Sequence, residues 1–256
     1  MDQGESFDAV ADLYAEVRRG YPAALFDDLA ALAGLGSEAR VLEVGCGAGQ
    51  ATSDLAARAT CVVALDPGPA LIEQARRRVA ASDVRFVVSR FEEFDPPAGK
   101  FDLVVSAQAW HWVDPAVGFA KAATALRPGG RIAIFGHVPM PPRDPIATAF
   151  KEAFDAHAPG VWGAPPPEAG YLPSGPFAQM IVQSGRFGPV THRRYAWSWR
   201  LDPATFGRYL RTNSSYHFLS EAPRFALFDA LAQAVRVHGG VYDSEWETHL
   251  YLARRL

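Results

Sequence analysis

The sequence predicts an α/β protein built on a doubly wound, mainly parallel β-sheet. Three observations predict it: short apolar runs alternate with segments of helical periodicity, the runs stay apolar on both faces, and a glycine-rich turn directly follows the first run. In chain order we expect strand 40–44, helix 49–58, strand 61–65, helix 69–80, strand 84–88, strand 102–106, helix 114–126 and strand 131–136. Crossover connections then place the carboxyl ends of the strands at one edge, where such sheets bind ligands.

The composition changes after residue 136. Stretches rich in proline and glycine at 139–142 and 158–167 bracket an expected helix, and alternating hydrophobicity predicts two further strands. The remaining expected elements are helix 144–157, strand 193–199, helix 203–219, helix 222–237 and strand 246–253. Long connections of this composition are commonly lids or binding loops.

From this pattern we expect a single domain over residues 1–256, with a helical cap over the carboxyl ends of the strands. Residues 1–35 are expected to form an N-terminal helical lid, and the insertions 137–189 and 200–240 are expected to form the cap. Within these parts, we expect residues 1–20 and 158–175 to be mobile and to close over bound ligands.

The composition is typical of a soluble enzyme and argues against several classes of partner. The chain has 256 residues, 49% of them hydrophobic, and its 25 basic residues nearly balance its 28 acidic ones. This balance gives no overall field to gather a phosphate backbone, so nucleic acid is not expected as a partner. No apolar run reaches the ~20 residues of a membrane span, and no secretory signal is recognisable. We expect a cytoplasmic monomer or homodimer that does not bind a membrane.

Two cysteines exclude a structural zinc site on count, and we expect no metal. Neither Cys46 nor Cys61 has a C-x-x-C partner or a histidine cluster nearby. Cys46 is interpreted as a small apolar residue in a tight turn, with a catalytic thiol as the alternative.

Residues 41–50, with the sequence VLEVGCGAGQ, join a buried strand to a turn of three glycines. Gly45, Gly47 and Gly49 can take backbone angles that are closed to other residues and carry no side chain. A ligand can therefore lie against the main chain where the strand passes into a helix.

The spacing of the glycines and of two acids indicates which ligand. A dinucleotide fingerprint reads G-x-G-x-x-G, whereas here the third glycine comes one residue early and Gln50 stands in the last position. Glu43, just before the turn, would repel a pyrophosphate and would suit a cationic ligand. Asp66 ends the second strand about 20 residues after the glycines, where an acid can bind both hydroxyls of a ribose. Together these features fit an adenosyl sulfonium.

With these residues the chain resembles the class I S-adenosylmethionine-dependent methyltransferases, in which E-x-G-x-G-x-G closes the first strand and an acid closes the second. Residues 101–114, FDLVVSAQAWHWVD, resemble the fourth strand and following loop of the small-molecule branch of that family, the methyltransferase type 11 or trans-aconitate methyltransferase-like enzymes. Residues 14–22 and 126–131 strengthen the likeness. The resemblance implies a Rossmann-like sheet of order 3-2-1-4-5-7-6 whose seventh strand is antiparallel, S-adenosyl-L-methionine as cofactor and S-adenosyl-L-homocysteine as product.

The resemblance and the local chemistry together nominate the residues that contact the cofactor. Phe91 offers an aromatic face and Arg90 polar contacts where the family reads the adenine, although a capped turn is an equally good interpretation of that segment. Tyr14 offers an aromatic face to the sulfonium. The expected cofactor-binding residues are Tyr14, Glu43, Gly45, Cys46, Gly47, Gly49, Gln50, Asp66, Pro67, Arg90, Phe91, Ser106 and Gln108.

A second set of residues is expected at the methyl acceptor. Tyr209, Asn213 and Tyr216 recur at spacings of four and three, so a helix over 203–219 would place them on one face. The expected acceptor-binding residues are Tyr21, Trp110, Trp162, Tyr209, Asn213 and Tyr216. His111 is the candidate general base, with a packed, hydrogen-bonded core histidine as the alternative.

The predicted function is transfer of a methyl group by in-line displacement to an oxygen or nitrogen of a small metabolite, such as a carboxylate, phenol or heterocycle, in a biosynthetic pathway. An NAD-dependent oxidoreductase shares the fold and the ribose acid, and is the first alternative. The second is a non-catalytic S-adenosylmethionine-binding protein, because a fold alone does not establish an activity.

Overall fold

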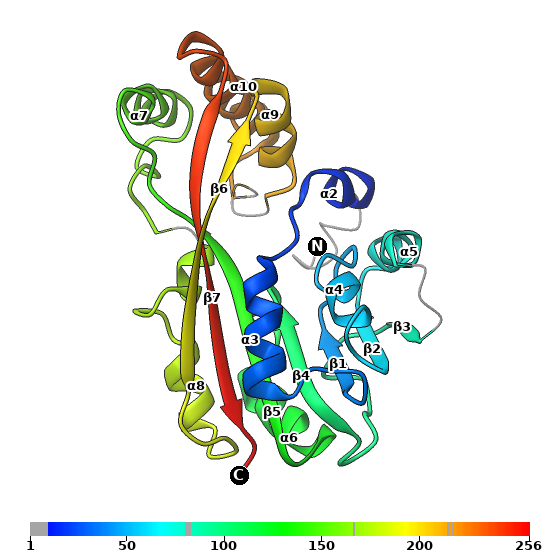
Figure 1. The fold of residues 1–256 in the computed structure, drawn as a ribbon. Helices are drawn as coiled ribbons and strands as arrows, with labels where there is room; N and C mark the ends of the chain where they lie inside the picture. The colour runs from blue at the N-terminus through cyan, green and yellow to red at the C-terminus, as the bar shows by residue number, and fades with distance from the viewer. Residues whose placement is uncertain (1–9, 80–82, 166, 214–215, 217) are drawn as a thin grey trace.

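The fold is a seven-stranded sheet flanked by helices (Figure 1), seen in a computed structural model that describes residues 10–79, 83–165, 167–213, 216 and 218–256. The expected lid residues 1–9 lie outside the described residues. The strands are β1 (Arg40–Val44), β2 (Cys61–Asp66), β3 (Val84–Val88), β4 (Phe101–Ala107), β5 (Leu126–Pro139), β6 (Thr191–Leu201) and β7 (Tyr242–Arg254).

The strand order β3-β2-β1-β4-β5-β7-β6 confirms the predicted topology. The first five strands pair in parallel, and β7 pairs antiparallel with both β5 and β6. The order reverses at β1, between β2 and β4, and this switch point opens a crevice beyond the carboxyl ends of the strands.

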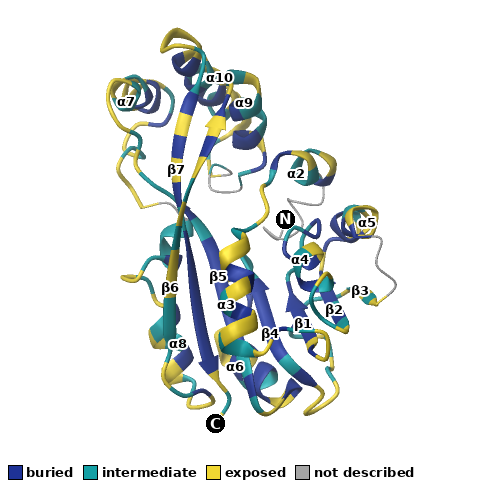
Figure 2. Cartoon of the chain, in the orientation of Figure 1, coloured by how far each residue is buried: buried dark blue, intermediate teal, exposed yellow. Residues whose placement is uncertain are grey.

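Helices cover both faces of the sheet because β1 is apolar on both sides. Val41 packs with α3, α4 and α5 on one face, and Leu42 packs with α6 and α8 on the other. Figure 2 shows the central strands buried between these layers. The helices are α2 (Ala11–Val17), α3 (Ala23–Ala33), α4 (Thr52–Ala56), α5 (Pro69–Arg78), α6 (Pro115–Ala125), α7 (Ile146–His157), α8 (Phe177–Gln183), α9 (Pro203–Arg211) and α10 (Glu221–Val237).

The N-terminal segment divides into two differently placed helices. Leu25, Phe26 and Leu29 of α3 are fully buried in the core, so α3 is a fixed layer of the sheet. The helix α2 instead packs on α5 through Ala11 and Leu71, near the carboxyl ends of the strands. Of the described part of the 1–35 segment, only α2 therefore occupies the place expected of a lid.

Three helices form a second core around the projecting ends of β6 and β7 (Figure 1). Phe150 of α7, Phe206 of α9 and Phe228 of α10 pack there with Trp199 and Trp246. The 200–240 insertion and α7 thus form a helical unit beside the crevice. In contrast, α8 packs through Phe177 and Ile181 on the main core, which corrects the expectation that all of 137–189 belongs to the cap.

The segment expected to be a mobile lid over 158–175 is anchored at Tyr171. The ring of Tyr171 is fully buried against Gly136 of β5, where an added Cβ would lie 2.7 Å from the ring, and its carbonyl accepts a hydrogen bond of 2.9 Å from the Tyr251 hydroxyl. Since Tyr171 is fixed in the core, the part of this segment around it forms a wall.

Two expected helices differ in length from the structure. The helix expected over 49–58 covers only Thr52–Ala56, because the glycine turn continues to residue 51. The helix expected over 203–219 ends at Arg211, where the Thr212 hydroxyl donates to the Tyr209 carbonyl at 2.7 Å and Arg18 donates to the Thr212 carbonyl at 2.8 Å. These bonds satisfy carbonyls that a continuing helix would have used.

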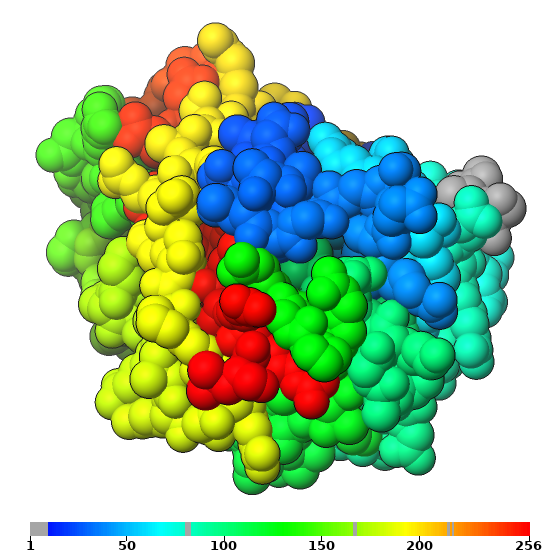
Figure 3. Space-filling model, turned by 60° about the horizontal axis from the view of Figure 1, so that its bottom comes forward, coloured from blue at the N-terminus to red at the C-terminus, as the bar shows by residue number. Residues whose placement is uncertain are grey.

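The C-terminus closes the end of the sheet opposite the crevice. The backbone N–H of Arg255 donates to the Gly130 carbonyl at 2.8 Å, and its guanidinium donates to the Leu126 carbonyl. Figure 3 shows the C-terminal residues against the neighbouring part of β5 on this face.

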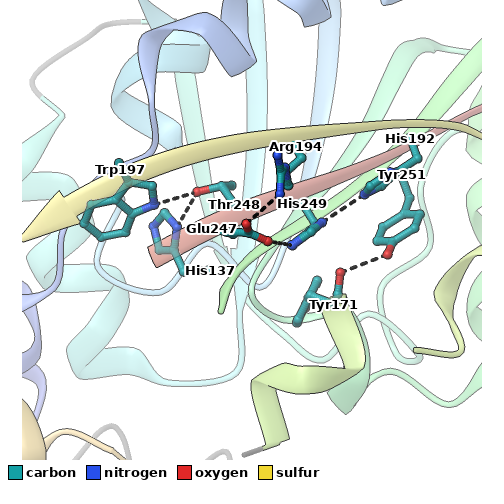
Figure 4. Close-up of polar contacts among 9 residues, drawn as sticks. All are labelled: His137, Tyr171, His192, Arg194, Trp197, Glu247, Thr248, His249 and Tyr251. Atoms are coloured by element: carbon teal, nitrogen blue, oxygen red, sulfur yellow. Dashed lines mark hydrogen bonds and ion pairs between the residues drawn. The ribbon is translucent and has the colours of Figure 1, made fainter. Parts of the chain in front are cut away.

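A chain of polar side chains joins β6 to β7 away from the crevice (Figure 4). The His192 Nε2 and His249 Nδ1 atoms lie 2.9 Å apart, and His249 Nε2 lies 3.1 Å from Glu247 Oε2. Arg194 donates to the other oxygen of Glu247 at 2.9 Å. The carboxylate can only accept, so His249 donates through Nε2, and its Nδ1 accepts from His192 Nε2.

We expect this histidine pair to make the free energy of unfolding fall below about pH 6.5, the usual pKa of histidine. Desolvation lowers the pKa of both His192 and His249 in the folded protein, and protonating His249 at Nδ1 would set its N–H against the N–H of His192. A group with a lowered folded pKa stabilises the fold above its unfolded pKa, and this contribution is lost as the pH falls from the unfolded pKa to the folded one. Chemical denaturation at pH 8, 7, 6 and 5 measures the effect.

The matched variant for this measurement is His192→Gln, whose amide keeps a donor for His249 but does not titrate. It should equal the wild type closely at pH 8 and lose less stability between pH 7 and pH 5. A decline with pH identical to that of the wild type would show that the pair does not govern acid stability.

Candidate functional site

A cavity of about 340 Å³ lies at the carboxyl ends of the strands, within the size range of small-molecule sites. The glycine turn, the ends of β2, β4 and β5, helix α2 and the projecting parts of β6 and β7 supply its walls. The sequence-predicted residues on these walls are Tyr14, Tyr21, Gly45, Cys46, Gly47, Gln50, Asp66, Pro67, Arg90, Phe91, Gln108, His111, Tyr209 and Asn213.

The three glycines of the turn all have positive φ angles, but their surroundings differ. A Cβ on Gly45 would lie 2.3 Å from the Cβ of Ala109, and one on Gly49 would lie 3.1 Å from the Cα of Ala75. Gly49 therefore permits the close approach of α5, and it does not line the cavity as predicted. At Gly47, with φ of 54°, an added Cβ would be in ordinary contact with Gln50 at 3.7 Å and Tyr14 at 3.8 Å, and this glycine lines the cavity.

Asp66 connects the end of β2 to the glycine turn. Its two carboxylate oxygens accept hydrogen bonds of 2.9 Å from the backbone N–H groups of Gly47 and Gly68. These bonds hold the carboxylate on the cavity wall, and each oxygen retains further lone pairs. The arrangement suits the recognition of a vicinal diol such as that of a ribose.

Glu43 is fully buried behind the glycine turn rather than on the cavity wall. Neither of its carboxylate oxygens has a hydrogen-bond partner among the described residues. Burial raises the pKa of Glu43 to about 7, the nearby Thr52 hydroxyl lowers it in part, and the charge of Asp66 raises it further. An unpaired acid at this depth fits a ligand that brings a positive charge or a hydrogen-bond donor to the turn.

Tyr14 and Gln50 form the roof next to Gly47. Tyr14 comes from α2, and burial raises the pKa of its hydroxyl, so the side chain is neutral at pH 7. The Gln50 amide nitrogen, Nε2, is buried without a hydrogen-bond partner in the described structure. The cavity thus offers an aromatic face and an unused donor close to the glycine turn.

Gln108 ends β4 with φ of 58°, a left-handed conformation unusual for a residue other than glycine. Two side-chain hydrogen bonds offset part of that strain. The Gln108 amide oxygen accepts from the His137 N–H at 2.6 Å, and its amide nitrogen donates to the His137 carbonyl at 3.2 Å. The predicted cofactor residue Gln108 therefore also fixes the end of β5.

His111 lies on the cavity wall, with Nδ1 at 3.3 Å from the Tyr171 hydroxyl. His111 is exposed on the cavity side, and partial desolvation by the surrounding protein lowers its pKa to about 4. The side chain is therefore neutral at pH 7 and can accept a proton only as a weak base.

Several predicted site residues lie away from the cavity. Ser106 is buried and donates to the Val44 carbonyl at 3.0 Å, tying β4 to β1. Trp110 is a core residue packed against Phe119 at 5.1 Å between ring centroids. These two predictions are corrected, because Ser106 is paired within β4 and Trp110 opens a short 3-10 helix, Trp110–Trp112, from which its ring joins the core.

Trp162 and Tyr216 also pack in the helical unit and not on the cavity wall. Their rings lie 5.4 Å and 6.2 Å from the ring of Phe154. The predicted shared face of Tyr209, Asn213 and Tyr216 is wrong, because α9 ends at Arg211.

The residues that sequence reasoning missed come mainly from β5, β6, β7 and the turn after α2. They are Arg18, Arg19, His137, Glu168, Trp197, Trp199, Phe218 and Trp246. The alternation of Trp197 and Trp199 was a readable signal for one wall. No local pattern could reveal that Trp246 lies opposite Trp197, since strand register is a tertiary property.

His137 is the most enclosed of these residues. Its ring stacks on Tyr21 at 4.3 Å, and burial lowers its pKa to about 3. Thr248 Oγ1 accepts from Trp197 Nε1 at 3.0 Å and lies 2.8 Å from His137 Nδ1 (Figure 4). The Thr248 hydroxyl therefore holds Nδ1 of a neutral His137 by a hydrogen bond.

Comparison with known proteins agrees with this geometry. Residues 41–130 match the methyltransferase domain family. The solved structure of a proposed type II methyltransferase from Anaeromyxobacter dehalogenans superimposes with a TM-score of 0.63 at 26% identity, over 93% of this chain and 97% of that one. These similarities support a class I S-adenosylmethionine-dependent methyltransferase. This fold implies S-adenosylmethionine as cofactor, and the unpaired Glu43 and the Gly47 backbone on the cavity wall fit it.

Two curated relatives are similar over part of their length. An uncharacterized methyltransferase of Mycobacterium tuberculosis is 36% identical over 133 residues, which are 52% of each chain. The biotin biosynthesis bifunctional protein of Bordetella avium is 34% identical over 196 residues, 71% of this chain and 40% of that protein. The chain spans about half the length of the mycobacterial relatives that it matches. Its place in the trans-aconitate-like branch stays a prediction.

Within the described residues, no group of three or more histidine, cysteine or acidic side chains is placed to hold a metal ion. Among the helices that the structure describes, none has the length and apolarity needed to cross a membrane.

We expect Gly47→Val to abolish binding of S-adenosylhomocysteine, because its methyl groups would enter the cavity where the backbone meets the ligand. Gly99→Val is the matched control. Gly99 also has a positive φ, of 64°, and no atom lies within 4 Å of an added Cβ. Both variants should lose about 1–2 kcal/mol of stability from the left-handed backbone, but only Gly47→Val should lose affinity in calorimetric titration. Normal affinity in folded Gly47→Val would make the turn purely structural.

We expect Asp66→Ala to weaken S-adenosylhomocysteine binding by about 10- to 150-fold, which corresponds to about 1.5–3 kcal/mol for lost charge-assisted hydrogen bonds. The control is Asp102→Ala, which removes a carboxylate that accepts from the Arg40 N–H at 2.9 Å at the far end of the sheet. Equal dissociation constants for the two folded variants would remove Asp66 from the site.

Proposed function

We propose that this chain transfers the methyl group of S-adenosylmethionine to an oxygen or nitrogen of a small metabolite. The observation that carries the proposal is the continuous cavity, which joins the glycine turn and Asp66 to a wall of aromatic side chains from β6 and β7. A cofactor at the first end and an acceptor at the second would meet inside one enclosed space.

When bound, S-adenosylmethionine supplies an electrophilic methyl carbon on a positive sulfur, so that an acceptor lone pair forms the new bond as the carbon–sulfur bond breaks and its electron pair stays on sulfur. The protein's contribution is positioning, which can supply on the order of 7–11 kcal/mol in a well-aligned pair of reactants. Asp66 and Gly47 fix one end of the cofactor, and Tyr14 encloses it from α2.

The remaining cavity residues would handle the acceptor. An anionic acceptor needs no base, whereas a hydroxyl must lose its proton. His111 faces the cavity in its neutral form and is the candidate that receives this proton. We propose that α2 and the unit of α7, α9 and α10 cap the acceptor and that the reaction uses no metal. We also propose that the enzyme is a cytoplasmic monomer or homodimer of a biosynthetic pathway. It binds neither nucleic acid nor membranes in this proposal.

The test combines binding with methyl transfer. We expect S-adenosylhomocysteine to raise the melting temperature and NAD to leave it unchanged, because Glu43 lies unpaired behind the turn where a pyrophosphate would be repelled. A screen with methyl-labelled S-adenosylmethionine against small carboxylic acids, phenols and nitrogen heterocycles should label at least one acceptor.

With an identified acceptor, kcat/KM should show no inflection near pH 6.5 from His111, since the pKa of His111 is lowered to about 4.

Each alternative has its own outcome in this test. Stabilisation by NAD without stabilisation by S-adenosylhomocysteine would support an oxidoreductase. Binding of S-adenosylhomocysteine with no labelled acceptor across the screen would favour a non-catalytic binding protein.

A further inference from the structure

Three tryptophans form one wall of the cavity at its acceptor end. Trp197 and Trp199 alternate along β6, and Trp246 of β7 is paired in register with Trp197, so all three lie on one face of the antiparallel pair. The rings of Trp197 and Trp246 stack at 5.4 Å with an interplanar angle of 20°. The Nε1 atoms of Trp199 and Trp246 are buried without a hydrogen-bond partner in the described structure. This wall suits a flat ring that carries hydrogen-bond acceptors.

Arg18 places a fixed positive charge on the same cavity. Its Nε and Nη2 atoms donate to the Thr212 hydroxyl at 3.0 Å and the Thr212 carbonyl at 2.8 Å. The guanidinium lies over the rings of Tyr14 and Tyr209, 5.2 Å and 4.8 Å from their centroids. Among the described residues no carboxylate forms an ion pair with it, and its Nη1 atom makes no hydrogen bond. Arg18 is therefore held in place with one nitrogen left for an anion.

The cavity is also unsuited to a cationic acceptor. An aromatic cage binds a cation through exposed ring faces. Here Arg18 lies over one face of the Tyr209 ring, and Arg19 lies 5.2 Å above the ring of Trp199. A bound amine would meet two arginines, whereas an acid would meet a ready partner.

Glu168 supplies the one acidic group among the described residues at this end of the cavity. Its Oε2 atom is buried without a hydrogen-bond partner in the described structure. The negative charge of Glu168 contributes to raising the pKa of Arg18 and of Tyr209. A carboxylate in this position accepts a hydrogen bond from a hydroxyl or ring N–H. It would repel a second anionic group, so it limits the acceptor to one.

We infer that the acceptor is a planar aromatic acid: its ring lies on the tryptophan wall, its single carboxylate binds Arg18, and a hydroxyl or ring N–H donates to Glu168. This inference rests on the proposed function and specifies its substrate class. The carboxylate acts as the recognition group, and the aromatic ring selects against flexible aliphatic acids of the same charge.

Four matched probes test the inference: 4-hydroxyphenylacetate, its alcohol tyrosol, its amine tyramine, and the saturated 4-hydroxycyclohexylacetate. Each is titrated calorimetrically into protein saturated with S-adenosylhomocysteine. We expect the aromatic acid to bind about tenfold or more tighter than the alcohol and the saturated acid, as one charge-assisted contact or one stacked ring implies. Tyramine should not bind measurably.

Arg18→Gln should reduce the preference for the acid over the alcohol to nearly one. Arg18→Lys, which keeps the charge, should retain part of the preference. Arg200→Gln is the control, since Arg200 follows Trp199 on β6, points to the opposite face and pairs with Asp243 at 4.0 Å. Unchanged affinity for S-adenosylhomocysteine verifies that each variant is folded.

The two proposals fail separately in this experiment. If S-adenosylhomocysteine does not bind, the proposed function is wrong. If it binds but no probe does, if tyramine binds as well as the acid, or if Arg18→Gln keeps the full preference for the acid, the substrate class is overturned and the proposed function stands.

Discussion

The hydrogen bond from the Gly47 N–H to the Asp66 carboxylate joins the ends of two neighbouring parallel strands, and the rest of the site depends on it. It forms because β1 and β2 run in parallel and in register, so that both chains leave the sheet at the same edge. The bond fixes the turn in a conformation that puts the Gly47 backbone on the cavity wall, and it orients an acid beside it. The cofactor end of the cavity is thus built from backbone geometry.

The acceptor end is built differently, from side chains on two strands that project beyond the sheet. The helices α7, α9 and α10 pack on these projecting strands, while Arg18 connects the turn after α2 to the end of α9 through Thr212. Because this end depends on side chains from distant segments, its chemistry can change without disturbing the glycine turn. This division accounts for a family that keeps one cofactor and varies its acceptors.

Electrostatics separates the two ends of the cavity. Near the turn, Glu43 and Asp66 are acids that suit a positively charged ligand. At the far end, Arg18 and Arg19 outnumber Glu168, and the two histidines are held neutral because burial lowers their pKa values. A cationic cofactor and an anionic acceptor would therefore each find the complementary end, and their charges would favour approach across the cavity.

The sequence by itself determined the sheet, its first five strands and the cofactor end, because hydrophobic periodicity and the glycine turn are local signals. Asp66 was found for the same reason, since its distance from the glycines is fixed by one helix and one strand. The sequence could not show that Glu43 lies behind the turn or that Gly49 serves helix packing. Nor could it show that Ser106 and Trp110 lie in the core, because burial depends on what packs from elsewhere in the chain. Only the tertiary structure brought Arg18, His137, Glu168 and the three tryptophans together. These residues lie on five separate segments, and the register of β6 on β7 and the packing of α2 and α9 decide which of their side chains meet.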